Sequence, residues 1–558
     1  FNTGVTAGYF TRYNASTNMN YKTGKVNFFG NYGFNGGKNR NYGFVNRPGF
    51  NNQDFRFVDD NSSHLIKLGA DVYLDDKNTL SFYTTQNWYN GDASGRAIIT
   101  DNNGTIVNYA PNTQVSENHS QAYNLNYKLD INDKGENLEL EGTYSLNNSP
   151  TDLMNTDTVN PTDGSLNYGN VIVNDRENLL LNIDYTNPIT DETKVELGLE
   201  YRNNKTENTN KTTQTGFSDS SFDYERRIIS GYVNLAHQIG KVSMQLGTRI
   251  EQFEVDANFN VQNIGNQNVK DYIFSFYPSA FFTYNPSEKN QFQLSYSRRV
   301  DRPSIKQVNP IREWSTPLIT SIGNENLVPQ FTNSLELNYT RQIKNGSLTF
   351  GTFYREISDA ISRVTYADSS DPSNIRQILS YSNFDDTNSY GLEFSANYKI
   401  NNWWRVNSSM DFYSQKQFGV ADLNNPSAER LEVQNEVFNA RISNNFKATK
   451  NLRFQLFAMY RGSQQDIQWN VEPMWMVNAG ASLNVLKGKG TVSFRVNDIF
   501  SGMKFGFNST RPYAQNGQFN WESHSANLSF NYRFGSGKNK AKRRRQRDNN
   551  EKTNTGGF

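Results

Sequence analysis

Large apolar and polar residues alternate one by one along much of this chain. In LSFNYRF, residues 528–534, every second residue is large and apolar, and the residues between are Ser, Asn and Arg. Successive side chains of a β-strand point to opposite faces, so such a segment is a strand with one apolar and one polar face. The pattern recurs in roughly twenty segments before residue 535. The chain is therefore predicted to be all-β.

Composition indicates where the apolar faces lie. The mean hydropathy is −0.78, and the chain has no run of about 18 apolar residues, which excludes transmembrane helices. Aromatic residues nevertheless make up 14% of the chain, as expected where rings line the two lipid interfaces of a membrane barrel. The absence of cysteine fits an oxidising compartment. We expect a transmembrane antiparallel up-and-down β-barrel.

The connections between strands predict its size. Ten tight polar turns, the first at Thr23-Gly24 and the last at residues 487–490, alternate with ten long polar loops. One strand near Val5–Phe10, ten hairpins about the turns and a closing strand ending at Phe534 give 1 + 20 + 1 = 22 strands. Both ends of the barrel segment then lie on the short-turn side, which is periplasmic in bacterial barrels. The long loops are predicted at residues 35–63, 90–119, 148–176, 204–224, 258–271, 300–333, 359–386, 416–434, 462–473 and 500–521.

The chain divides into two parts of different composition. Residues 1–534 contain no linker and are predicted to form one barrel. Residues 535–558 carry eight Lys or Arg and two acids, a net charge of +6, against +1 for the whole chain. This basic tail is predicted to be disordered and periplasmic. A nucleic-acid patch is the alternative for the tail, but the interleaved aromatics of such patches are absent.

The predicted number of strands bears on function. Barrels of about 22 strands enclose a lumen so wide that known examples are plugged. The first strand starts within the first dozen residues, so we expect the plug, after a leader peptide, to precede Phe1 in the full protein.

The centre of the chain carries a recognisable motif. YSRRVDRPS (296–304), Asn309-Pro310 and GNENLVPQFTNSLELNY (323–339) resemble the strand–loop–strand pattern of TonB-dependent receptors, with Gln330 where a Glu is usual. Residues 13–35 and the closing LSFNYRFG with its basic tail resemble the barrels common in Bacteroidota. The resemblance implies an outer-membrane importer. It also implies as partners outer-membrane lipid, an N-terminal plug and through it the TonB complex, the barrel assembly machinery and a surface lipoprotein.

Two groups of candidate site residues follow. The prolines of the motif interrupt strand pairing, and its cations and tryptophan either contact an anionic or sugar-like ligand or brace the loop against the wall. This first group is Arg298, Arg299, Arg302, Arg312 and Trp314. Charges on polar strand faces would line the lumen and dock the plug. This second group is Glu196, Glu200, Arg202, Glu336, Lys399, Arg453, Arg495 and Arg533.

Catalytic and metal-binding patterns are missing. His64, His119, His237 and His524 are far apart in the sequence and lack metal-ligand spacing, so each is predicted to be a solvated or interfacial imidazole. We predict no enzyme, no cofactor and no metal. The leading hypothesis is an importer of a metal chelate, glycan or peptide. The alternatives are a structural or secretion-associated barrel and, less favoured, a rim enzyme.

Overall fold

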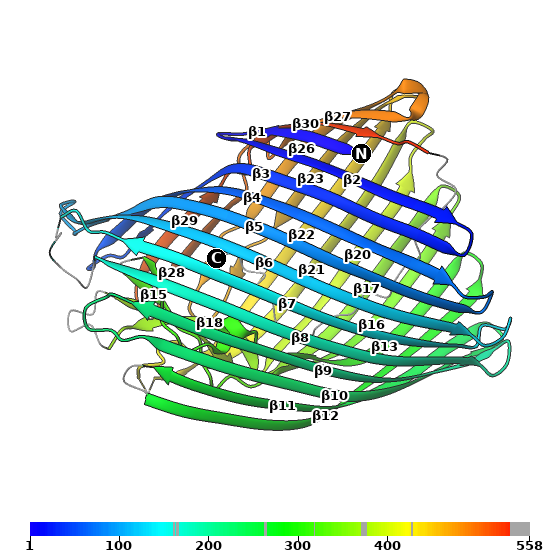
Figure 1. Ribbon diagram of the computed structural model, residues 1–558, viewed down its shortest axis with the longest axis horizontal. Helices are drawn as coiled ribbons and strands as arrows, with labels where there is room; N and C mark the ends of the chain where they lie inside the picture. Colours follow the sequence, from blue (N-terminus) through cyan, green and yellow to red (C-terminus); the bar gives the residue numbers. More distant parts are fainter. Residues whose placement is uncertain are drawn as a thin grey trace.

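The computed structural model describes residues 1–159, 162, 167–261, 265–316, 318–369, 376–425 and 428–535. Its wall is a closed antiparallel barrel of 22 strands (Figure 1). The wall strands are β1 (Asn2–Ala7), β2 (Thr11–Thr23), β3 (Val26–Asn46), β4 (Asn52–Tyr73), β5 (Asn78–Thr100), β6 (Ile106–Asp130), β7 (Asn137–Asn155), β8 (Tyr168–Pro188), β9 (Thr193–Thr212), β10 (Ser220–Ile239), β11 (Val242–Val261), β12 (Gly265–Ser287), β13 (Asn290–Asp301), β16 (Gln330–Ile343), β17 (Gly346–Ser358), β20 (Thr387–Lys399), β21 (Trp404–Val420), β22 (Arg430–Lys447), β23 (Leu452–Arg461), β26 (Met474–Val485), β27 (Gly490–Asn497) and β30 (Ser525–Tyr532).

The ends of the chain close the barrel. β30 pairs with β27 on one side and with β1 on the other, where Val5 lies opposite Leu528. The predicted strand number and the tight turns are confirmed. For example, β10 and β11 are joined through Gly240, whose φ of 56° favours glycine. The first strand lies slightly earlier than the predicted Val5–Phe10, because the chain already reverses at residues 8–10.

Five of the predicted long loops are wrong in extent. In the regions predicted as loops at residues 35–63, 90–119, 148–176, 204–224 and 258–271, the strands continue, and the first two connections shrink to residues 47–51 and 101–105. The ten strands β3–β12, here called the tall wall, are 19–25 residues long. A tilted strand crosses a bilayer in about 9–11 residues. The tall wall therefore projects well beyond the membrane on the long-loop side.

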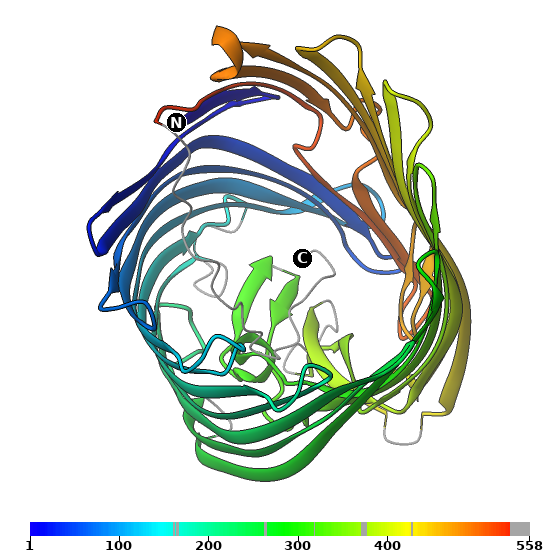
Figure 2. The same ribbon diagram turned by 90° about the vertical axis from the view of Figure 1, so that its right-hand side faces the viewer.

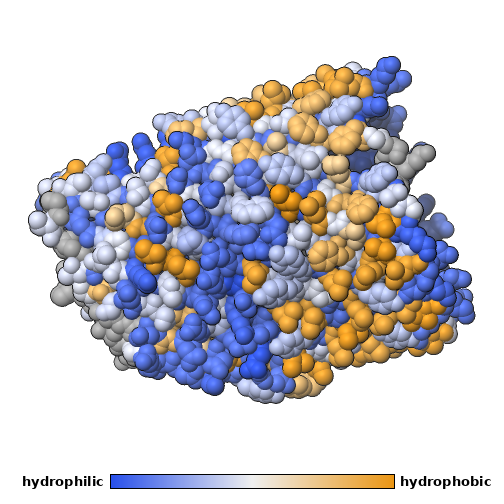
Figure 3. Space-filling model, viewed as in Figure 1, coloured by the Kyte–Doolittle hydropathy of each residue, from blue (hydrophilic) through white to orange (hydrophobic). Residues whose placement is uncertain are grey.

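The two halves of a tall strand reverse their apolar faces. In the half of β11 nearer the tight turns, Leu246 and Ile250 face outward, each 40% exposed. In the other half Phe253 and Phe259 are buried inward while Asp256 faces outward. The register of β11 with β10 continues unbroken through this change. Figure 3 shows the consequence: apolar residues gather toward the end of the barrel that carries the tight turns.

A row of rings marks the change on the outside of β3–β6. Trp88 lies opposite both His64 and His119 in the register. It stacks on His119 with the ring centroids 5.1 Å apart, and His64 Nδ1 is 2.9 Å from the hydroxyl of Tyr32. Such rings are typical of the membrane–water interface.

The loops of the opposite half of the barrel carry additional elements. The β13–β16 connection forms α1 (Ile305–Val308), β14 (Glu313–Thr316) and β15 (Ile319–Ser321), and the β17–β20 connection forms β18 (Ala360–Ala367) and β19 (Gln377–Phe384). These four strands make a separate sheet in which β15 and β19 are parallel, and Figure 2 shows that this internal sheet lies within the barrel ring. The remaining elements are β24 (Gln464–Gln465), β25 (Asn470–Val471), the 3₁₀ turn η1 (Leu486–Gly488), β28 (Lys504–Ser509) and β29 (Gln515–Trp521).

Among the described residues, the helices are all too short or too polar to cross a membrane. The predicted tail, from residue 536 onward, lies outside the described residues.

Candidate functional site: the lumen and its internal sheet

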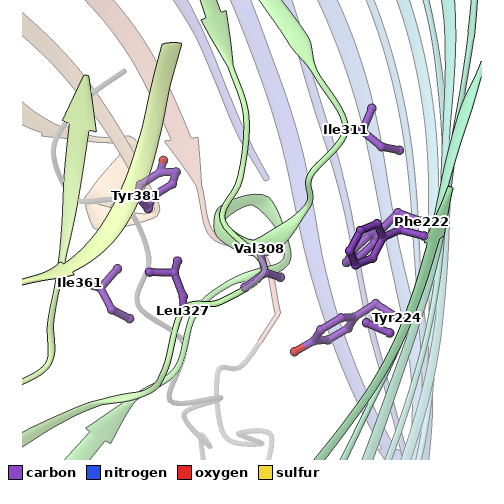
Figure 4. Packing of buried hydrophobic residues seen from close by; sticks show 9 residues of the cluster. Phe222, Tyr224, Val308, Ile311, Leu327, Ile361 and Tyr381 are labelled. Atoms are coloured by element: carbon purple, nitrogen blue, oxygen red, sulfur yellow. The ribbon is translucent and has the colours of Figure 1, made fainter. Parts of the chain in front are cut away.

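The internal sheet is attached to the tall wall by an apolar core. Phe222 and Phe259, on the inner face of β10 and β11, belong to one buried cluster with Val308 and Ile311 from the segment around α1 and with Leu327 and Ile361. In Figure 4, Val308 and Leu327 lie between Phe222 of the wall and Ile361 of β18. A second core, containing Val364 of β18 and Val433 of β22, joins the same sheet to another part of the wall. The sheet is thus held from two sides and occupies part of the lumen.

A buried ion pair reinforces this attachment. Arg302, in the loop that follows β13, is 1% exposed, and its guanidinium binds the carboxylate of Glu251 on β11. The guanidinium also lies 3.5 Å from the hydroxyl of Tyr277 and 5.1 Å from the ring centre of Phe253. Buried charges need such partners because desolvation is costly. Of the two roles considered for Arg302, the geometry fits bracing of the loop against the wall.

The pair belongs to a larger inward-facing charge network. Arg249 bridges Glu251 and Glu200, with N–O distances of 2.5 and 2.6 Å. Arg202 approaches the same carboxylate of Glu200 at 2.9 Å. The sequence pointed to Glu200 and Arg202 but missed Arg249 and Glu251. The alternation in RIEQ (249–252) places both on the polar face, and nothing in the sequence indicates that Arg302 reaches them.

The other motif residues lie apart from this network. Arg312 pairs with Asp368 at 2.7 Å and lies 5.4 Å from the ring of Phe217, so it too joins separate segments. The guanidinium of Arg298 lies 4.9 Å from the ring of Phe331.

The remaining predicted motif and rim residues lie elsewhere. Arg299 is exposed near the end of β13, and Trp314 lies on β14, where only its backbone is described. Its neighbour Glu313 is in the internal sheet, where burial raises the pKa of the carboxyl group. Arg533 follows β30 at the tight-turn rim and donates to the carbonyl of Gly488 at 3.3 Å.

The inner wall near the tight turns carries clusters of cations and of carboxylates on different strands. A cavity of about 940 Å³ near the tight-turn end is lined by cations from β20 to β27. They are Lys399, Arg405, Lys447, Arg453 and Arg495. Around the ring, the inner faces of β7–β9 carry carboxylates instead. These are Glu139, Glu141, Asp184, Glu196 and Glu200, of which Glu196 pairs with Lys194 and Glu200 with Arg202 and Arg249. Glu336 lies on β16 and pairs with Arg355 at 3.1 Å.

Within the described ranges, no group of three or more His, Asp or Glu side chains could hold a metal ion. The histidines of the outer row bind tyrosine or stack on tryptophan, His237 meets the hydroxyl of Thr193 at 2.8 Å, and His524 meets the carbonyl of Asp498 at 2.9 Å.

Comparison with known proteins agrees with this architecture. Residues 129–532 match the outer membrane protein beta-barrel family. No curated protein matches the chain in sequence. Among solved structures, the siderophore receptor PiuA from Acinetobacter baumannii is similar, with a TM-score of 0.62 and 16% identity over 95% of this chain and 81% of that one.

Two further structures have the same fold. The ferric yersiniabactin uptake receptor FyuA from Yersinia pestis has a TM-score of 0.63 and 11% identity over 96% of this chain and 79% of that one. The ferripyoverdine receptor of Pseudomonas aeruginosa has a TM-score of 0.60 and 12% identity over 95% and 71%. These likenesses confirm the receptor-type barrel fold that the central motif predicts.

Proposed function

Because this chain belongs to the outer membrane protein beta-barrel family, we propose that it is the barrel of a TonB-dependent receptor that imports a large or scarce solute. The observation that carries the proposal is a 22-strand barrel whose lumen contains a sheet fixed to the wall at two places. So wide a barrel without internal structure would leak. The fixed sheet favours selective uptake over free diffusion, and the structural neighbours are receptors for iron chelates.

The charge clusters of the inner wall support a plug as the partner. An acidic face of the plug would lie against the cations of β20–β27, and a basic face against the carboxylates of β7–β9. Complementary potentials of this kind would fix the plug in one orientation. Energy from the TonB complex would then move that plug. Arg299 and Lys399 remain available as solute or plug contacts in this scheme. The barrel assembly machinery and a surface lipoprotein are further proposed partners of this chain. The basic tail is proposed to lie in the periplasm. No enzymatic role is proposed.

A genetic test addresses the whole proposal. The gene is deleted from the source bacterium, and uptake of labelled ferric chelates, oligosaccharides and short peptides is measured with and without a protonophore. We expect the deletion to abolish uptake of one class of solute. The complete gene should restore that uptake, and the protonophore should abolish it again. Uptake that survives the protonophore would contradict TonB dependence. Unchanged uptake of every class, combined with altered surface protein content, would instead favour the structural or secretion-associated role.

A further inference from the structure

A second large cavity lies in the upper lumen, between the internal sheet and the wall. Its volume is about 680 Å³, and its lining comes from β3, β4, β15, β18, β19, β21 and β29, among other segments. The volume suits a solute of several rings. Gln330 of the central motif lines it, whereas none of the candidate site residues chosen from the sequence does.

One side of the cavity is an aromatic surface. Phe55 on β4 and Phe519 on β29 face each other across β3, with ring centroids 5.0 Å apart. Gly43 permits this approach, because a Cβ at that position would lie 2.6 Å from Phe55 Cζ. Phe507 and Trp469 extend the surface, with ring centroids 5.1 Å apart.

The rest of the lining is rich in neutral amides. Nine of the 30 lining residues are Gln or Asn, whereas four are charged. One of the four, Arg461, is engaged by the side-chain oxygen of Gln464. An amide offers both a hydrogen-bond donor and an acceptor. A lining of amides therefore suits a ligand with hydroxyl groups better than a ligand with a fixed negative charge.

Two of these amides are buried and contain atoms that have no hydrogen-bond partner among the described residues. Gln53 is 2% exposed, and neither atom of its amide has a hydrogen-bond partner among the described residues. Gln515 Nε2 and the hydroxyl of Thr387 also have no hydrogen-bond partner among the residues that the structure describes. Both residues are buried and line the cavity. Buried polar groups are almost always hydrogen-bonded, so unpaired ones at a cavity wall indicate a ligand that completes them.

We propose that this cavity binds a neutral oligosaccharide, with sugar faces on the Phe55–Phe519–Trp469 surface and hydroxyl groups on Gln53, Gln515 and Thr387. A pyranose ring combines an apolar C–H face with hydroxyl groups that both donate and accept, which matches the two kinds of lining. The proposal rests on the receptor function proposed above and names its solute class. It departs from the iron chelates of the structural neighbours because the lining is mostly uncharged.

The test measures binding to the full chain in detergent micelles by calorimetry and by quenching of tryptophan fluorescence. The probes are short malto-, cello- and chito-oligosaccharides, a neutral peptide and a ferric hydroxamate chelate. Gln53→Met is the main variant, and it should fold well because it removes unpaired buried polar atoms. It should weaken oligosaccharide binding by about tenfold or more, the loss expected for one or two hydrogen bonds. Trp469→Leu should weaken binding and reduce the quenching.

The matched control is Gln114→Met, which alters an exposed amide on β6 away from the cavity, and it should bind as the unmodified protein does. Oligosaccharide binding that is equal in Gln53→Met and the unmodified protein would overturn the site. Binding of the peptide or chelate alone, weakened by Gln53→Met, would overturn the oligosaccharide class while leaving the receptor function standing. Failure of all probes to bind, together with unchanged uptake after gene deletion, would overturn both.

Discussion

The tall wall has a lower half, nearer the tight turns, and an upper half, nearer the long-loop side. The two halves have the same strand geometry but opposite environments. In the lower half, residues such as Leu246 present apolar side chains outward and charged groups such as Arg249 inward. In the upper half, Phe259 points inward to a protein core and Asp256 points outward, paired with Lys270 at 2.9 Å. The apolar face follows the location of the water-free environment, which is lipid outside below and the internal sheet inside above. A period of two identifies the strand but not which face is the interior of the protein.

The largest expected effect is at the level where the inner face changes from polar to apolar. Glu251→Gln would leave Arg302 buried with its charge uncompensated and should cost about 3–5 kcal/mol. The measurement is urea unfolding in lipid bilayers. The control is Glu254→Gln on the outer face of the same strand, whose pair with Arg227 is half exposed and should cost no more than about 1 kcal/mol. Equal stabilities of the two variants would remove the buried pair as a brace.

A second variant tests the core of the upper half. Phe222→Ala removes a ring that is 1% exposed and should cost about 3–5 kcal/mol where the wall meets the internal sheet. Hydrogen exchange of the β18 and β19 amides should accelerate, while the lower half of β10 stays protected. Phe274→Ala, which truncates an exposed ring on the outside of β12, is the control. Unchanged exchange in β18 and β19 would show that the sheet is held independently of this core.

A third variant compares the outer faces of the two halves directly. Leu246→Arg puts a charge into the lipid-facing belt and should cost about 2–4 kcal/mol near the bilayer midplane. Asn258→Arg makes the same change on the same face of β11 in the upper half, where it should stay within about 0.5 kcal/mol. Refolding into bilayers measures both values. Similar costs at the two positions would contradict the placement of the membrane over the lower half only.

Periodicity and turn chemistry were sufficient to predict the wall. Alternation and tight polar turns specified the closed 22-strand barrel and the inward position of Glu200, because strand spacing and turn signals are local properties. The length of the tall strands was missed because their upper halves have a polar outer face and only scattered inward aromatics. A strand expected to have apolar residues on its outer face cannot be recognised in such a sequence, which resembles a polar loop. Phe253 and Phe259 alternate regularly, but with the phase that the lipid-facing interpretation rejects.

The interior could be predicted only in part. Arg302 was recognised as a candidate for bracing or binding, yet its partner Glu251 lies 51 residues earlier and is fixed by the closure of the barrel. The internal sheet was missed because its strands β15 and β19 are 3 and 8 residues long and come from different loops. The unpaired amide of Gln53 is likewise visible only when β3, β4 and β29 are brought together.

The smallest predicted effect concerns the boundary between the halves. His119→Ala removes the ring stacked on Trp88 and should cost about 0.5–1.5 kcal/mol in bilayer refolding. The control is His237→Ala on β10, far from this row, because His237 meets the hydroxyl of Thr193 and stacks on no ring of the described strands. Trp88 should be quenched most strongly by lipids brominated near the headgroups, because the outer-face polarity changes at its row. Strongest quenching by lipids brominated at the chain ends would move the boundary upward, and the outer residues Asp54 and Arg56 would then be closer to lipid than their charge allows.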